Sequence, residues 1–314
     1  MRTAFVTGAR GLVGSWLVDA LLARDVAVLV LERPQAGRAP DGRVSTVTGD
    51  LTGGVEPLRR ALDEHGVDSV FHLAARSTGA AAAADPAGTF EVNVRGTWTV
   101  LEACRLHGVE RAVVASTDRV YGAAPQTRLT EELPLLGRAV YDASKVAADL
   151  LARSAAFDAV PVAVVRTTNV YGGGDRNHSR LVPELIGAAL CGRPPVIHTD
   201  GSPRRRHLYV EDAVAAYLAV ADGLDAGLAG EAFNAGGDRE HSVQELAEVV
   251  RELAGVELAP DVRGAPVPAP LVDRLDLDCF KLQAATGWTP RVGLREGLER
   301  TLAWYRAHPG VLTP

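Results

Sequence analysis

The chain has few lysines, few cysteines and no long hydrophobic run. Lys145 and Lys281 are the two lysines among 33 basic residues, so lysine at either place departs from the arginine used elsewhere. The three cysteines lie far apart without C-x-x-C spacing, which argues against a disulfide scaffold and predicts reduced thiols in a reducing, cytoplasmic compartment. Because no run of 18 uncharged apolar residues occurs, no membrane-spanning helix is expected.

Concentrated positive charge is also scarce. The net charge is −6, and the one basic cluster, PRRRH at 203–207, is too short for a nucleic-acid surface. No group of histidine, cysteine and aspartate has the spacing of metal ligands, so no metal site is expected. Hydrophobic residues make up 47% of the 314 residues, which is enough for a substantial core and is typical of a globular enzyme.

Short apolar runs alternate with helical patterns in the first half of the chain. The runs at 3–8, 26–32, 68–75 and 111–117 are rich in valine, alanine and leucine, and such continuous apolar strands indicate a parallel sheet covered on both faces. One long helix is expected over 88–108. After residue 171, glycine and proline become frequent, which predicts a smaller α/β domain. We expect one domain over 1–168 with 206–238 returning to it, and a second over 169–205 and 239–314.

A glycine-rich turn follows the first predicted strand. Gly8, Gly11 and Gly14 in TGARGLVG open a helical pattern, and Glu32 ends the next strand eighteen positions beyond Gly14. Glycines there permit a tight turn and close approach to a pyrophosphate, and the acidic residue accepts hydrogen bonds from a ribose. The pattern predicts a doubly wound, Rossmann-type sheet that binds NAD. Arg33 keeps NADP as a less favoured alternative, because its guanidinium can meet a 2′-phosphate.

The YDASK segment places one of the two lysines four residues after a tyrosine. On a helix, Tyr141 and Lys145 share one face. A nearby ammonium stabilises tyrosinate and lowers the pKa of the phenol, which makes tyrosine a usable base. The compact ammonium also suits the hydroxyls of a nicotinamide ribose better than the planar fork of arginine. An accidental helical pair is the alternative, and the upstream nucleotide motif weighs against it.

Three polar residues end the strand predicted at 111–117. Ser116, Thr117 and Asp118 lie at its carboxyl end, where ligands bind in doubly wound sheets. Thr117 is a candidate hydrogen-bond partner for a substrate oxygen, and Asp118 for proton transfer. The same residue types also favour a simple turn.

Together these motifs resemble an extended short-chain dehydrogenase/reductase of the nucleotide-sugar epimerase and dehydratase group. The matching segments span the whole chain: TGARGLVG, GD at 49–50, FHLAA at 71–75, NVRGT at 93–97, STDRVYG at 116–122, YDASK, RTTNVYGGG at 166–174, YVEDAVAAY at 209–217 and TGWTPRVGLREGLERTLAWY at 286–305. The segments GSWL and YDASK look most like the CDP-glucose 4,6-dehydratase branch.

The resemblance implies a cofactor site. The pyrophosphate would lie on Gly8, Gly11 and Gly14, with Arg10, Leu12 and Val13 in the same loop. The adenosine half would contact Glu32, Arg33, Asp50 and Leu51. The nicotinamide half would contact Leu73, Ala74, Ala75, Asn93, Ser116, Tyr141 and Lys145.

The resemblance also implies a nucleotide-sugar site, with Thr117, Asp118, Tyr141 and Lys145 as the catalytic group. Substrate contacts are expected from Ser77, Arg119, Asn169, Arg205 and Arg274. The family has arginine, aspartate and an aromatic residue in turn where this chain has Arg205, Arg206 and His207. A homodimer is the expected assembly.

Family members share oxidation of the sugar at C4, and their later steps differ. We favour 4,6-dehydration, in which water leaves across C5 and C6 and hydride returns to C6, because Thr117-Asp118 resembles the dehydratase pair. The family's dehydratases follow this pair with lysine or glutamate, and Arg119 is a poor base. A 4-epimerase or a uronic acid decarboxylase therefore stays open, since neither needs a base for C5. A dinucleotide-binding sensor or structural subunit is the alternative that is not an enzyme.

Overall fold

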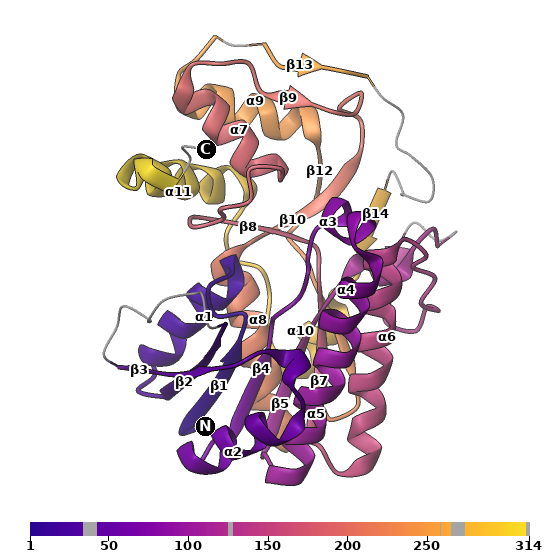
Figure 1. Cartoon of the computed structure of the whole chain (residues 1–314). Coiled ribbons are helices and arrows are strands. Elements are labelled where there is room, and N and C mark those ends of the chain that lie inside the picture. Colours follow the sequence, from indigo (N-terminus) through magenta and orange to yellow (C-terminus); the bar gives the residue numbers. More distant parts are fainter. Residues whose placement is uncertain (34–42, 125–127, 258, 265–273, 312–314) are drawn as a thin grey trace.

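The large sheet determines the architecture of the computed structural model, which describes residues 1–33, 43–124, 128–257, 259–264 and 274–311. Within these residues the sheet has seven parallel strands in the order β11-β7-β5-β4-β1-β2-β3 (Figure 1). The strands are β1 (Thr3–Thr7), β2 (Ala27–Glu32), β3 (Val44–Thr48), β4 (Ser69–His72), β5 (Arg111–Thr117), β7 (Val162–Thr167) and β11 (Ala232–Ala235). This order confirms the predicted doubly wound sheet.

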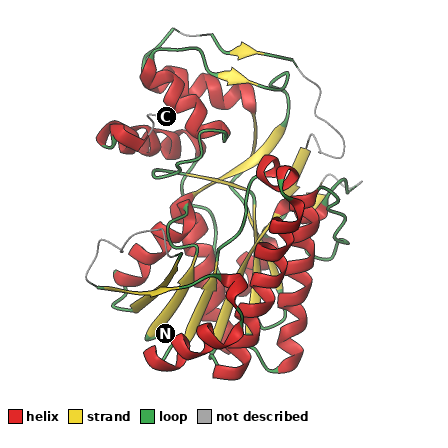
Figure 2. Cartoon of the chain, in the orientation of Figure 1, coloured by secondary structure: helices red, strands yellow, loops and turns green. Residues whose placement is uncertain are grey.

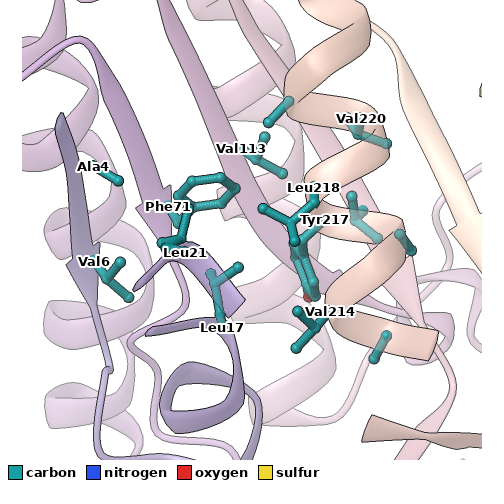
Figure 3. Packing of buried hydrophobic residues seen from close by; sticks show 14 of the residues in the cluster. Ala4, Val6, Leu17, Leu21, Phe71, Val113, Val214, Tyr217, Leu218 and Val220 are labelled. Atoms are coloured by element: carbon teal, nitrogen blue, oxygen red, sulfur yellow. The ribbon is translucent and has the colours of Figure 1, made fainter. Parts of the chain in front are cut away.

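Helices cover both faces of this sheet because alternate strand residues point to opposite sides. On one face, α1 (Leu12–Leu22), α8 (Val210–Gly223) and α10 (Phe280–Thr286) pack on residues such as Val6 and Val113. Figure 3 shows Phe71 of β4 and Tyr217 of α8 in this layer. On the other face lie α2 (Val55–His65), α5 (Gly96–His107) and α6 (Val140–Ala155). The strands therefore read as continuous apolar runs.

The helix expected over 88–108 is interrupted. The structure has α4 (Pro86–Phe90), a π-helical turn η2 (Glu91–Arg95) and then α5, and a short helix α3 (Gly79–Ala84) precedes them. A π turn inserts one residue per turn and reorients the side chains on it. Asn93 lies in this turn and is buried, so the interruption aims its amide at the neighbouring loop. Among the described helices, none has the length and apolarity needed to cross a bilayer.

A smaller lobe lies beyond the carboxyl ends of the strands (Figures 1 and 2). Its helices are α7 (Leu181–Cys191), α9 (Val243–Ala254) and α11 (Leu294–Ala307), which share one apolar cluster. Its strands are β6 (Arg128–Leu129), β8 (Asn169–Tyr171), β9 (Val196–Ile197), β10 (Arg204–Tyr209), β12 (Glu240–Ser242), β13 (Asp261–Val262) and β14 (Arg274–Leu277).

One hydrogen bond links this lobe to the first helix of the sheet. The indole Nε1 of Trp16 in α1 donates to the carbonyl of Gly173 at 2.8 Å. A Cβ added at Gly173 would lie 2.2 Å from the Trp304 ring of α11, so the loop after β8 fits between two tryptophans. β11, which lies in the segment 206–238 expected to return to the first domain, pairs with β7 in the large sheet. The two-domain division itself stays a prediction.

Candidate active site at the carboxyl end of the sheet

The glycine turn after β1 forms a tight cradle. Gly8 has φ +74°, and a Cβ there would lie 2.7 Å from the backbone nitrogen of Ala74. A Cβ at Gly14 would lie 2.1 Å from the carbonyl oxygen of Gly8. Helix α1 begins at Leu12, and its N-cap, Gly11, offers no capping side chain. Free amides at a helix N-terminus bind anions, so the cradle fits the pyrophosphate of a dinucleotide.

The carboxylate expected to bind the adenosine ribose lies at the end of β2. Glu32 is buried and accepts a hydrogen bond from Nε of Arg10 at 2.7 Å, whereas Arg33 is exposed. Arg10, in the middle of the glycine turn, therefore ties the cradle to β2. A carboxylate in this position favours ribose hydroxyls over a 2′-phosphate, which fits NAD better than NADP.

Asp50 is engaged in its own turn. Its Oδ1 accepts from the backbone nitrogen of Thr52 at 2.8 Å and from the Thr52 hydroxyl at 2.7 Å, and these bonds lower the pKa of Asp50. Leu51, which follows, is buried against α5. In this structure the Asp50 carboxylate shapes the turn η1 (Leu51–Gly53), and its proposed contact with adenine stays a prediction.

The loop after β4 approaches the cofactor cradle. The backbone nitrogen of Leu73 donates to the Thr7 carbonyl at 3.2 Å, and that of Ala74 donates to the Thr7 hydroxyl at 3.3 Å. Ala75 follows and is partly buried. These bonds hold the loop against β1, beside Gly8, where the sequence places a cofactor contact.

Asn93 acts as a clamp on the same loop. Its Oδ1 accepts from the backbone nitrogen of Arg76 at 2.8 Å, and its amide donates to the Arg76 carbonyl at 3.1 Å and to the Ser144 hydroxyl at 2.9 Å. Asn93 thus joins the β4 loop to α6, and Ser77 beside it is exposed. The Asn93 amide bonds protein partners on both sides, and its proposed contact with nicotinamide stays a prediction.

Tyr141 and Lys145 both lie in the first turns of α6. Nζ of Lys145 donates to the Ala115 carbonyl at 2.6 Å, and burial lowers the pKa of Lys145 to about 8. Burial raises the pKa of Tyr141 to about 12, against the opposing charges of Arg119 and Arg180. The sequence predicts that Lys145 lowers the pKa of Tyr141. In the structure burial has the largest effect on this pKa and raises it, and the cations that act to lower it are Arg119 and Arg180.

Ser116, Thr117 and Asp118 lie at the end of β5, on the same edge. The Ser116 hydroxyl donates to Asp149 at 2.8 Å, and the Thr117 hydroxyl donates to Oδ1 of Asp118 at 3.0 Å. Asp118 is 3% exposed. Burial raises the pKa of Asp118 to about 6, with Arg205 and the Thr117 hydrogen bond opposing the shift. Asp118 is therefore a carboxyl group that keeps its proton to a higher pH than an ordinary aspartate and exchanges it near pH 6.

Arg119 turns toward Tyr141. Its Nε donates to Oδ1 of Asp142 at 2.6 Å, and its guanidinium carbon lies 5.6 Å from the centroid of the Tyr141 ring. Arg119, next to Asp118 in the turn η3 (Asp118–Tyr121), thus occupies the place where the family's dehydratases have an exchangeable group.

Three of the five proposed substrate residues, Asn169, Arg205 and Arg274, come from the smaller lobe. Asn169, the first residue of β8, lines a cavity of about 180 Å³ together with Tyr171, Asp175, Arg180 and His207. Arg180, which the sequence did not single out, forms an ion pair with Asp175 at 3.1 Å. Its position before α7 and its effect on Tyr141 place it near the site.

Arg205 and Arg206 of β10 and Arg274 of β14 differ in what the structure shows of them. Arg205 lies close enough to Asp118 to lower its pKa. Arg206, the departure from the family pattern, pairs with Asp276 at 2.6 Å and donates to the Gly237 carbonyl at 2.8 Å, so it braces β10 against β14. Arg274 begins β14, and its side chain lies outside the described part of the structure.

A buried ion pair beneath the site was missed from the sequence. Arg166 in β7 donates twice to Asp149 in α6, at 2.9 and 2.8 Å, and both side chains have 0% exposure. Arg166 also donates to the Tyr121 hydroxyl at 2.9 Å. Two signals were available: Asp149 continues the four-residue spacing of Tyr141 and Lys145, and Arg166 is a lone charge in an apolar run.

Among the described residues no three histidine, cysteine, aspartate or glutamate side chains are grouped as metal ligands. Comparison with known proteins identifies the family. Residues 4–236 match the "NAD dependent epimerase/dehydratase family". A dTDP-glucose 4,6-dehydratase of Streptomyces griseus is 34% identical over 96% of this chain and 94% of its own length. A UDP-glucose 4-epimerase of Mycolicibacterium smegmatis is 33% identical over 98% and 99%.

A solved structure is similar throughout. The dTDP-glucose 4,6-dehydratase DesIV of Streptomyces venezuelae, solved with NAD and TYD bound, has a TM-score of 0.88 and 32% identity over 98% of both chains. These similarities confirm the resemblance found in the sequence. The chain belongs to the NAD dependent epimerase/dehydratase family.

Proposed function

We propose that this chain is an NAD-dependent nucleotide-sugar 4,6-dehydratase. The observation that supports dehydration is Asp118, a buried carboxyl group whose pKa is raised to about 6, beside the Thr117 hydroxyl at 3.0 Å. Departure of a 6-hydroxyl requires a proton, and a carboxyl group whose pKa is raised toward neutrality can take one up and deliver it at the working pH. A 4-epimerase has no step that needs this proton.

Each of the chain's site residues has a separate role in the proposed reaction. NAD, when bound on the glycine cradle, supplies hydride exchange with the sugar. Tyr141 takes the proton of the 4-hydroxyl, Thr117 donates a hydrogen bond to the developing C4 carbonyl oxygen, and Lys145 positions the nicotinamide ribose. The C4 ketone acidifies C5, and ionised Asp118 takes the C5 proton and passes it to the departing 6-hydroxyl, which leaves as water. Hydride then returns to C6 while a proton, replacing the one removed, adds to C5. Asn169 and Arg205 hold the diphosphate of the nucleotide sugar.

The product mass tests this proposal directly. The purified protein is incubated with NAD and a panel of CDP-, UDP-, GDP- and dTDP-hexoses and uronic acids, followed by mass spectrometry. Loss of one water from one hexose is the expected result. Asp118→Asn should lose dehydration while the first hydride transfer, seen as reduced nicotinamide absorbance, is retained. Glu64→Gln on the exposed face of α2 is the matched control.

A 4-epimerase is the second candidate, and one observation favours it. Arg119 is paired with Asp142 at 2.6 Å, so the position beside Asp118 offers a bound cation where dehydration of the C5–C6 bond needs a base. An unchanged mass with a new retention time would establish the epimerase and overturn the role of Asp118. Loss of carbon dioxide from a uronic acid would establish a decarboxylase. If a Tyr141→Phe protein still performed the function of the parent protein, catalysis would not be that function, and a dinucleotide-binding sensor or structural subunit would be the interpretation that remains.

A further inference from the structure

Arg119 and the Tyr141 ring form a contact that the reaction scheme leaves unexplained. The guanidinium carbon lies 5.6 Å from the ring centroid, within the range of an attractive cation–π contact. Lys145 instead donates to the Ala115 carbonyl at 2.6 Å. The positive charge over the phenol therefore comes from η3, a different element from the one that carries Tyr141.

Asp142 fixes the guanidinium in this place. Nε of Arg119 and Oδ1 of Asp142 are 2.6 Å apart, and Asp142 is 4% exposed. A Cβ added at Gly137 would lie 2.9 Å from Cβ of Asp142 and 3.0 Å from the Arg119 carbonyl oxygen. The loop at Gly137 thus packs against Asp142 and the backbone of Arg119, and the ion pair is formed by a buried carboxylate and a guanidinium whose side chain is 31% exposed.

We propose that Arg119 is a positioning residue for Tyr141: clamped by Asp142, its guanidinium stays over the ring and stabilises the phenolate that removes the sugar proton. The proposal rests on the proposed role of Tyr141 as base. It assigns a use to the residue that replaces the lysine or glutamate of the family's dehydratases. Because arginine stays protonated throughout the working pH range, this stabilisation does not vary with pH, as that of Lys145 would.

Several charged or titratable groups face Tyr141. Arg119 and Asp118 come from η3, Asp142 from α6, Arg180 from the segment before α7, and Tyr217 from α8. The two arginines lower the pKa of Tyr141, and Asp118 and Asp142 raise it. The two possible roles of Asp142 therefore predict opposite changes in the pKa of Tyr141. If Asp142 acted through its charge alone, neutralising it would lower the pKa of Tyr141. If it holds Arg119 in place, neutralising it raises that pKa.

The ionisation of residue 141 tests the clamp without any substrate. 3,5-Difluorotyrosine, whose phenol ionises at lower pH than tyrosine, is placed at 141 in the full chain and titrated by fluorine NMR. Arg119→Gln should raise the midpoint by about one pH unit, and Arg119→Lys should restore part of the shift. Asp142→Asn should also raise the midpoint. Arg138→Gln, an exposed arginine three residues before Tyr141, is the control and should leave it unchanged.

Two results would overturn the proposal: an unchanged midpoint in Arg119→Gln, or a lowered midpoint in Asp142→Asn. Circular dichroism of each variant checks folding, and Arg119→Lys keeps the charge if the glutamine variant fails to fold. The proposed function can fail separately. If Arg119→Gln shifts the midpoint but the protein dehydrates no sugar, the proposed reaction is wrong and the role of Arg119 stands. If the protein is an active dehydratase and the midpoint is unshifted, the role of Arg119 is wrong.

Discussion

At the residue scale, one buried carboxyl group with a proposed catalytic role also affects stability. Asp118 has a pKa of about 6 in the folded protein against 3.8 when unperturbed, so the folded chain binds a proton that the unfolded chain releases. Stability from this group is complete below pH 3.8 and is lost as pH rises through about 6. At pH 8 the loss amounts to at most about 3 kcal/mol.

Asp118→Asn should therefore stabilise the protein at alkaline pH. The amide keeps the shape of the side chain without the buried charge, so we expect a gain of about 1–3 kcal/mol at pH 8 and little gain at pH 4.5. Urea unfolding of both proteins at the two pH values measures the difference. An equal effect at both values would show that the charge of Asp118 carries no cost.

The glycine turn and α1 form the cofactor element. Gly14→Ala places a Cβ 2.1 Å from the Gly8 carbonyl, so the turn must open and lose its fit to the pyrophosphate. We expect NAD affinity to fall at least about tenfold, or roughly 1.4 kcal/mol, by isothermal titration calorimetry. Gly79→Ala is the control, because a Cβ there meets nothing within 4 Å. Equal affinities in both variants would place the pyrophosphate elsewhere.

Strand β7 and α6 are joined by the ion pair of Arg166 and Asp149. Arg166→Met leaves a buried carboxylate unpaired, which should cost about 3–5 kcal/mol of unfolding free energy. Replacing both partners, as Arg166→Met with Asp149→Leu, should cost less than the single change because no charge remains buried. Chemical unfolding of the three proteins compares them. A double variant less stable than Arg166→Met would contradict this expectation, because the buried charge of Asp149 would then not be the cause of the lost stability.

At the scale of the whole molecule, an apolar surface remains on α5 and α6. Trp98 is 49% exposed and Phe157, just after α6, is 92% exposed, and a groove between these helices is lined by Trp98, Leu101 and Leu151. Exposed apolar area of this kind marks an interface. We propose that a second copy of the chain covers it, as the family resemblance implies.

Charged substitutions on this surface should separate the two copies. Trp98→Asp and Phe157→Asp each place a carboxylate in the interface, and light scattering after size exclusion should report a monomer. Phe280→Ser, an equally apolar and exposed residue on α10, should leave the dimer intact. A monomeric parent protein, or a dimer that survives both aspartates, would place the interface elsewhere.

The sequence predicted the sheet and the cofactor cradle because both follow local rules. Apolar runs and the spacing of Gly8, Gly11 and Gly14 depend on neighbours in the chain. The direction of Arg119 was beyond such rules, since its partner Asp142 lies on another element. The buried pair of Arg166 and Asp149 escaped for the same reason. The sequence predicted a lowered pKa for Tyr141, whereas burial raises it. Residue spacing in the sequence indicates which charged groups lie nearby, but it does not indicate how deeply the phenol is buried.

The bond between Trp16 and Gly173 has a consequence for timing. A chain that must return a hydride to the molecule that lost it cannot release either ligand midway. The indole joins the helix at the proposed pyrophosphate cradle to the loop beside the proposed sugar site, at 2.8 Å, so we expect a movement at one site to affect the other. If binding of one ligand stabilises the Trp16–Gly173 hydrogen bond and thereby raises the affinity for the other, the second ligand raises the affinity for the first by the same factor. We therefore expect that binding of one ligand raises the equilibrium affinity for the other, which favours completion of the proposed reaction before either molecule departs.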